Sequence, residues 1–96
     1  MGTQEVHLDE EQFTLISKAV SDPKRFEMLQ RVSQSGPAPT CSCLRDCLQL
    51  APATISHHLK ELEVAGLVQV EREGKYAYIR LRREVWNAYL KRLSSL

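Results

Sequence analysis

The stretch ATISHHLKELEVAGLV, residues 53–68, decides the fold. Three apolar residues in it recur at the spacing of one helical face: Ile55, Leu59 and Leu62. A side that is apolar at this spacing packs inward. Pro52 suits the first helical position, and Gly66 suits the position just past a helix end. The sequence therefore predicts an amphipathic helix over residues 52–65.

The outer face of that helix carries small polar groups and a cation. His57 and Lys60 lie opposite the apolar side, and Thr54 lies nearer its flank, as does Ser56. Such groups can hydrogen-bond base edges or phosphates in the major groove of DNA. A helix face that is only solvated has the same composition, so both interpretations stand at this point. His58 lies at the border of the apolar side, where we expect packing rather than base contact.

A first helix is predicted upstream, from about residue 10. Asp9 can cap it, and Gln12 stands at the reciprocal position of a capping box. Leu8 and Phe13 have the spacing of a hydrophobic staple. The helix start is therefore well specified.

A second helix begins at Asp22 and Pro23, because a capping residue followed by proline suits a helix N-terminus. It is expected to run to about Ser35 and to bury three apolar residues: Phe26, Leu29 and Val32. A short third helix is expected over residues 42–48, just before the helix 52–65.

The pattern changes beyond Gly66. Residues 67–72 (LVQVER) and 75–81 (KYAYIRL) are rich in Val, Tyr and Ile, with Glu73-Gly74 between them, which predicts a β-hairpin. A last helix is expected over residues 83–95. The fold class is therefore mainly α with a small β-hairpin, a winged helix-turn-helix that occupies residues 1–96 as one domain.

The hairpin tip carries two basic residues. Arg72 and Lys75 flank the turn, where they can reach phosphates or an adjacent minor groove and add salt-dependent affinity. An ordinary charged turn is the alternative. Tyr76 and Tyr78 alternate along the strand, and we expect them to pack within the wing.

Other protein classes find little support in the composition. No apolar run is long enough to span a bilayer, and the acidic N-terminus lacks the layout of a signal peptide, so a cytoplasmic protein with reduced thiols is expected. We predict that the chain is not an enzyme, because no cysteine has a histidine within local reach and no glycine-rich phosphate loop is present. A winged helix that binds only proteins remains an alternative.

Three segments together resemble one family. SDPKRFEMLQRV (21–32), ATISHHLKELEVAGLV and VEREGKYAYIRL (70–81) are similar to the second helix, the recognition helix and the wing of the ArsR/SmtB family. The resemblance spans about residues 13–82. It implies a homodimeric bacterial repressor that binds double-stranded operator DNA and releases it when an inducer binds.

The first and last helices support a dimer independently. They carry more apolar side chains than a small winged domain can cover: Phe13, Ile16, Trp86, Tyr89, Leu90 and Leu93. A two-fold pair would bury this stripe and set two recognition helices about one DNA turn apart. A purely intramolecular core is the alternative.

All three cysteines lie within PTCSCLRDCLQL, residues 39–50. Cys43 and Cys47 share a helical face, because they are four residues apart. Cys41 can join them only if it lies just before the helix. A helix N-terminus lowers thiol pKa and favours thiolates. Three thiolates suit As(III) or Sb(III), whereas zinc needs a fourth donor.

The resemblance to the ArsR/SmtB family supports a metalloid site at the cysteines, although their spacing differs by one residue. Arsenite-sensing members carry C-x-C-x-x-C in this helix, whereas this chain has C-x-C-x-x-x-C. The Asp and His pairs of zinc-sensing members are missing from residues 83–95. We therefore predict a repressor released when arsenite or antimonite binds Cys41, Cys43 and Cys47, with the pull transmitted to the recognition helix. Another thiophilic metal, thiol oxidation or simple packing of the cysteines are the alternatives.

Overall fold

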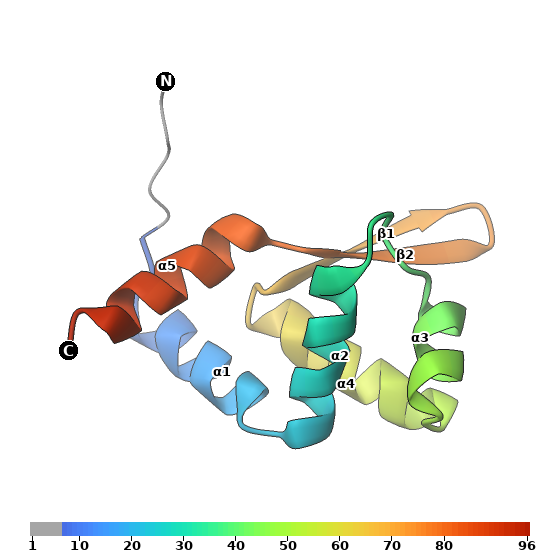
Figure 1. The fold of residues 1–96 in the computed structure, drawn as a ribbon, viewed down its shortest axis with the longest axis horizontal. Helices are drawn as coiled ribbons and strands as arrows, with labels where there is room; N and C mark the ends of the chain where they lie inside the picture. The colour runs from blue at the N-terminus through green and yellow to red at the C-terminus, as the bar shows by residue number, and fades with distance from the viewer. Residues whose placement is uncertain (1–6) are drawn as a thin grey trace.

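The computed structural model describes residues 7–96 and contains every predicted element. The elements follow in this order: α1 (Glu10–Val20), α2 (Pro23–Gln34), α3 (Cys41–Leu48), α4 (Pro52–Val64), β1 (Val68–Glu73), β2 (Tyr76–Leu81) and α5 (Arg83–Ser94). Figure 1 shows α1 and α5 at one end of the molecule, while the hairpin extends from the other end above α3. The predicted winged helix-turn-helix is confirmed.

The start of α1 follows one half of the predicted capping box. The side chain of Asp9 accepts a hydrogen bond from the Gln12 backbone N–H at 2.8 Å. The Gln12 side chain does not return to Asp9; its amide donates to the Ala65 carbonyl at the end of α4, at 3.3 Å. Gly66 allows this approach, because its φ is +80° and a Cβ there would lie 2.6 Å from the Gln12 amide nitrogen.

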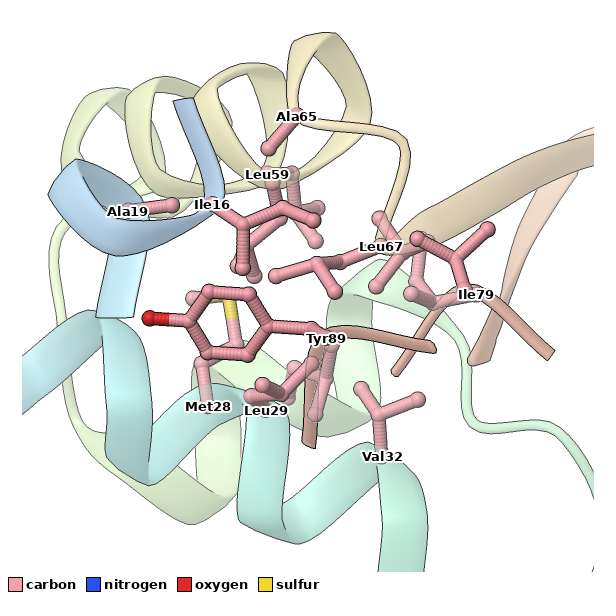
Figure 2. Packing of buried hydrophobic residues seen from close by; sticks show 14 of the residues in the cluster. Ile16, Ala19, Met28, Leu29, Val32, Leu59, Ala65, Leu67, Ile79 and Tyr89 are labelled. Carbon is pink, nitrogen blue, oxygen red and sulfur yellow. The ribbon is translucent and has the colours of Figure 1, made fainter. Parts of the chain in front are cut away.

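The core lies between α1, α2, α4, the base of the hairpin and α5. Figure 2 shows Ile16, Met28, Leu59, Leu67 and Tyr89 converging on one cluster. Each of these side chains is at least nine-tenths buried.

The expectation for α2 needs one correction. Leu29 and Val32 are buried as predicted, but Phe26 is 37% exposed and Met28 is fully buried in its place. At about 100° per residue, Phe26 lies about 200° around the helix from Met28. The apolar face of α2 therefore turns away from the side that Phe26 occupies.

The hairpin turn lies one residue later than predicted. Glu73 still pairs with Tyr76, so the loop consists of Gly74 and Lys75. Gly74 has a φ of +61°, as the first central residue of a tight hairpin turn requires. Arg72 lies inside β1, opposite Ala77.

The chain just before α3 pairs with the other edge of the hairpin at a single β-bridge. The Ile79 backbone N–H donates to the Pro39 carbonyl at 2.8 Å. Thr40 forms an antiparallel bridge with Tyr78. Because Ile79 already pairs with Val70 of β1, residues 39–40 lie along the opposite edge of β2.

None of the helices within residues 7–96 has both the length and the apolar character that crossing a membrane requires.

Candidate DNA-binding surface and cysteine site

Helix α4 presents the predicted polar face to the surface. Its three predicted core residues, Ile55, Leu59 and Leu62, are all buried. Three of the four candidate DNA contacts are exposed, and the fourth is half-buried: Ser56, His57, Lys60 and Thr54. One side of α4 thus anchors the helix, and the other carries hydrogen-bonding groups suited to base edges and phosphates.

His58 packs against the start of α2, as expected. It is 6% exposed, and its Nδ1 atom is one of two buried side-chain atoms without a hydrogen-bond partner among residues 7–96, the other being Arg25 Nε. Burial lowers the pKa of His58, although the carboxylate of Asp22 opposes this shift. His58 therefore joins α4 to α2 as a buried, neutral side chain and stands apart from the outer face.

The wing places its basic residues at the tip. Arg72 and Lys75 are exposed, and the Lys75 ammonium lies 5.5 Å from the centre of the Tyr76 ring. Tyr78 is half-buried and Tyr76 is 48% exposed, and the two rings contact each other within the wing, as expected. The two rings are 6.3 Å apart. The hairpin tip therefore offers two cations and an exposed aromatic ring.

Helix α3 begins one residue earlier than predicted, which separates Cys41 from the other thiols. Thr40 caps the helix by accepting a hydrogen bond from the Cys43 N–H at 3.1 Å, so Cys41 is the first helical residue. Cys41 and Cys43 then point about 200° apart, at about 100° per residue. Within residues 7–96, no three His, Cys, Asp or Glu side chains are grouped to hold a metal ion. The expected common face for three thiols is not formed.

Cys43 and Cys47 do share a face. Both are exposed, and a hydrogen bond to the Cys47 sulfur raises the pKa of the Cys43 thiol, followed by smaller effects that include the charge of Asp46. The expectation that the helix N-terminus favours thiolates is therefore wrong for Cys43. The two thiols form a hydrogen-bonded pair at the surface.

Cys41 has different surroundings. It is half-buried and packs against the core. Burial raises the pKa of its thiol, while the guanidinium groups of Arg72 and Arg45 act in the opposite direction. Cys41 therefore lies beside the wing, with charged groups of α3 and β1 near it.

The predicted dimer stripe divides between core and surface. Ile16 is fully buried and Tyr89 is 5% exposed, so the core of the single chain takes both and neither offers surface to a partner. Leu90 and Leu93 are 43% and 39% exposed. The expectation is therefore corrected for the two buried residues.

The other two stripe residues are half-buried and pack on Tyr89. The ring centres of Phe13 and Trp86 lie 5.2 Å and 5.7 Å from that of Tyr89. The Arg92 guanidinium lies 4.0 Å from the centre of the Phe13 ring and pairs with Glu10, so it joins α5 to α1. A continuous apolar surface remains on α5, with Phe13 at its edge.

A groove of about 230 Å³ lies beside this surface, between α2 and α5. Phe26 and Trp86 line it, together with Leu81 and Arg83. Arg83 and Trp86 are three residues apart and so share a face of α5. The groove thus meets the stripe at Trp86.

Comparisons with known proteins agree with this architecture. Residues 20–71 match a family described as a helix-turn-helix domain. The chain is 35% identical, over 74 residues, to the arsenical resistance operon repressor of Bacillus subtilis (strain 168); the match covers 76% of this chain and 69% of that protein.

Solved structures give the same result. The crystal structure of an ArsR family transcriptional regulator has a TM-score of 0.79 and 27% identity, covering 94% of this chain and 91% of that one. A homodimeric winged helix-turn-helix DNA-binding domain from Mycobacterium bovis has a TM-score of 0.72 at 22% identity, covering 88% of this chain and 79% of that one.

These relatives are regulators of transcription, so the expectation that the chain is not an enzyme is confirmed. The matched helix-turn-helix includes α3 and α4, whose outer face carries the polar groups described above. The chain belongs to the ArsR family of winged helix-turn-helix transcriptional repressors.

Proposed function

We propose that this repressor binds operator DNA as a homodimer and releases it when arsenite or antimonite bonds to the thiols of α3. The observation that carries the proposal is the exposed, hydrogen-bonded pair of Cys43 and Cys47 on a helix that contacts both α4 and β2. The name of the Bacillus subtilis relative, an arsenical resistance operon repressor, supports a metalloid as the inducer.

DNA is read by α4 and held by the wing. The outer face of α4 enters the major groove, where Ser56 and His57 can hydrogen-bond base edges and Lys60 can neutralise a phosphate, with Thr54 at the flank. Arg72 and Lys75 at the hairpin tip contact backbone phosphates. These two cations contribute affinity and salt dependence rather than sequence discrimination.

A second copy of the chain covers the exposed apolar surface of α5. Leu90 and Leu93 lie at its centre, with the partly buried rings of Phe13 and Trp86 beside them. A two-fold pair formed through this surface sets two copies of α4 side by side, as two half-sites one helical turn apart require. The homodimeric neighbour with the same fold supports this arrangement.

The thiol chemistry conserves atoms and oxidation state. Each thiol gives its proton to a hydroxyl group of arsenous acid, which leaves as water while an arsenic–sulfur bond forms. The raised pKa of Cys43 does not prevent this exchange, because the thiol supplies the proton that the departing hydroxyl needs. Cys43 and Cys47 take the first two bonds, and Cys41 takes the third after the first turn of α3 rearranges.

Native mass spectrometry of the reduced protein, with and without arsenite, tests the inducer. We expect a dimer that gains one arsenic per chain and loses three thiol protons from each. The Cys41→Ser variant should lose two. An operator duplex selected from random sequences, followed by fluorescence anisotropy, then tests release. A dimer that ignores arsenite contradicts the proposal, and one that takes cadmium instead moves the inducer to a divalent soft metal.

Thiol oxidation is the second candidate, and the same cysteine pair favours it. Hydrogen peroxide can take two electrons and two protons from Cys43 and Cys47, which leaves a disulfide and two molecules of water. Residues four apart in a helix must distort it to meet disulfide geometry. The same mass spectra decide between the candidates, because oxidation removes two hydrogen atoms from the chain and adds no arsenic.

A further inference from the structure

The segment just before α3 belongs to the wing. Pro39 accepts the hydrogen bond from the Ile79 N–H, and Thr40 bridges to Tyr78, so residues 39–40 are attached to the outer edge of β2. Figure 1 shows the chain passing from beside the strands directly into α3. The two ends of α3 are therefore joined to different elements. Its C-terminal end leads to α4 through Gln49, which has a φ of +54°, and its N-terminal end leads to β2.

Thr40 connects strand and helix with no intervening residues. Its backbone bridges to β2, and its side chain caps α3 by accepting the Cys43 N–H. Cys41 follows after one peptide bond. The half-buried Cys41 side chain packs against the core near Arg72 of β1. A displacement of Cys41 therefore shifts Thr40 first, and with it the contact between Thr40 and the edge of β2.

Bringing Cys41 to the thiol pair demands such a movement. Its side chain points about 200° away from that of Cys43, at about 100° per helical residue. To face Cys43 and Cys47, Cys41 must leave its packed position and the first turn of α3 must unwind. Unwinding removes the Thr40 cap and rotates the peptide that holds Pro39 against Ile79.

We infer that Cys41 controls the position of the wing. Displacing its side chain detaches residues 39–40 from β2 and moves the hairpin, with its basic tip, relative to α4. The sequence alone predicts that a movement of the cysteines reaches the recognition helix. The backbone contacts of residues 39–40 with β2 indicate that the movement reaches the wing first. The inference deepens the proposed function and rests on it only for the identity of the ligand.

Displacement of the wing changes a measurable property of DNA binding. Arg72 and Lys75 contribute phosphate contacts only while the wing lies along the DNA. Each lost contact reduces the steepness of the plot of log K against log salt by about 1. Displacement of Cys41 therefore reduces the salt dependence of binding as well as the affinity.

The test uses two matched single-thiol proteins. One, Cys43→Ser/Cys47→Ser, keeps only Cys41; its control, Cys41→Ser/Cys43→Ser, keeps only Cys47. Each is treated with methyl methanethiosulfonate, which transfers a small methylthio group to the sulfur with loss of methanesulfinate, and the adduct is removed again by dithiothreitol. The readouts are amide hydrogen exchange at Ile79 by NMR and the salt slope for random duplex DNA.

We expect the adduct on Cys41 to speed exchange at Ile79 by about tenfold, the mark of local opening, and to lower the salt slope by about 1 to 2. The adduct on Cys47 should change neither. The Leu67 amide, which donates to Leu62 within the core, should stay protected in both proteins.

Two results would overturn the inference that Cys41 controls the wing. One is an adduct on Cys41 that leaves Ile79 protected, whatever happens to DNA binding. The other is loss of protection at Leu67 along with Ile79, since the adduct would then unfold the core rather than move the wing. Failure of the proposed function is distinguishable, because a protein that binds no arsenite in the mass spectra still gives a result with the adducts.

Discussion

Single residues explain how the recognition helix is held in place. Two contacts matter most: His58, at the middle of α4, is buried without a partner for Nδ1, and Gly66 lets Gln12 of α1 reach the Ala65 carbonyl just past the end of α4. Neither residue faces the predicted DNA surface. The orientation of the predicted DNA-binding face of α4 is therefore set by residues that lie outside that face.

The buried His58 makes stability depend on pH. Its folded-state pKa is depressed by burial, so the unfolded chain binds the proton more tightly and stability rises with pH. The contribution is complete above about pH 6.5, the ordinary value for histidine, and is lost as the pH falls below it. Urea unfolding from pH 8 to pH 5 measures it. We expect His58→Gln to flatten the profile; a profile that flattens only in the exposed-site control His57→Gln would contradict the assignment.

Gly66 is expected to resist substitution. An alanine there must adopt a φ of +80° with its Cβ 2.6 Å from the Gln12 amide nitrogen. The left-handed conformation alone costs about 1–2 kcal/mol. We expect Gly66→Ala to lower the free energy of unfolding by at least this amount in chemical denaturation. Gly36→Ala is the matched control, because nothing lies within 4 Å of its Cβ position; equal losses in the two variants would refute the explanation.

At the scale of elements, α3 and the hairpin form one mechanical unit. The backbone contacts of residues 39–40 with β2 join them, and Cys41 lies at the junction. Helix α4 contacts α1, α2, α3 and β1, while the hairpin contacts α2, α3 and α4. The element that carries the thiols thus contacts both α4 and the hairpin.

The wing should contribute salt-dependent affinity. Removing one phosphate contact lowers the slope of log K against log salt by about 1. We expect Arg72→Ala to show this loss with random duplex DNA in anisotropy titrations. Lys18→Ala, on α1, is the control because it lies on neither α4 nor the wing. An unchanged slope for Arg72→Ala would leave the hairpin tip as an ordinary charged turn.

The element order followed from local sequence signals, and the departures came from tertiary contacts. Asp9, Pro23 and Pro52 mark helix starts with groups that act within one turn, so these starts were predictable. Phe26 was misplaced because the apolar residues of α2 allow two inward faces, and only packing against the other helices selects the one with Met28.

The arrangement of the cysteines could be predicted only in part, for a comparable reason. Cys43 and Cys47 were paired correctly because a spacing of four is a property of the helix itself. The position of Cys41 depends on where α3 begins, and that is set by the pairing of Pro39 and Thr40 with β2, almost forty residues away in sequence. No local pattern records that pairing.

At the scale of the whole molecule, function is divided between two ends. The reader and the thiols lie at the wing end, and the apolar surface of α5 lies at the other (Figure 1). Joining two chains through α5 leaves both readers free. The groove beside Trp86 extends this surface towards α2 and offers a partner additional apolar area.

A charge placed on the α5 surface should separate the two chains. Burying an unpaired carboxylate in an apolar interface is costly, so we expect Leu90→Glu or Leu93→Glu to yield monomers. Sedimentation velocity would detect the change. Val64→Glu is the control, since Val64 is 53% exposed but lies on α4, away from the stripe. Dimers that survive both α5 substitutions would place the interface elsewhere.

The contact of Arg92 with Glu10 and the Phe13 ring has a consequence for the speed of assembly. It fixes α1 against α5 within one chain, so the pairing surface has its shape before a partner arrives. In the proposed dimer, encounter would need no prior rearrangement, and pairing would proceed at the rate that collision and orientation allow. A newly made chain would then be ready to pair as soon as it has folded.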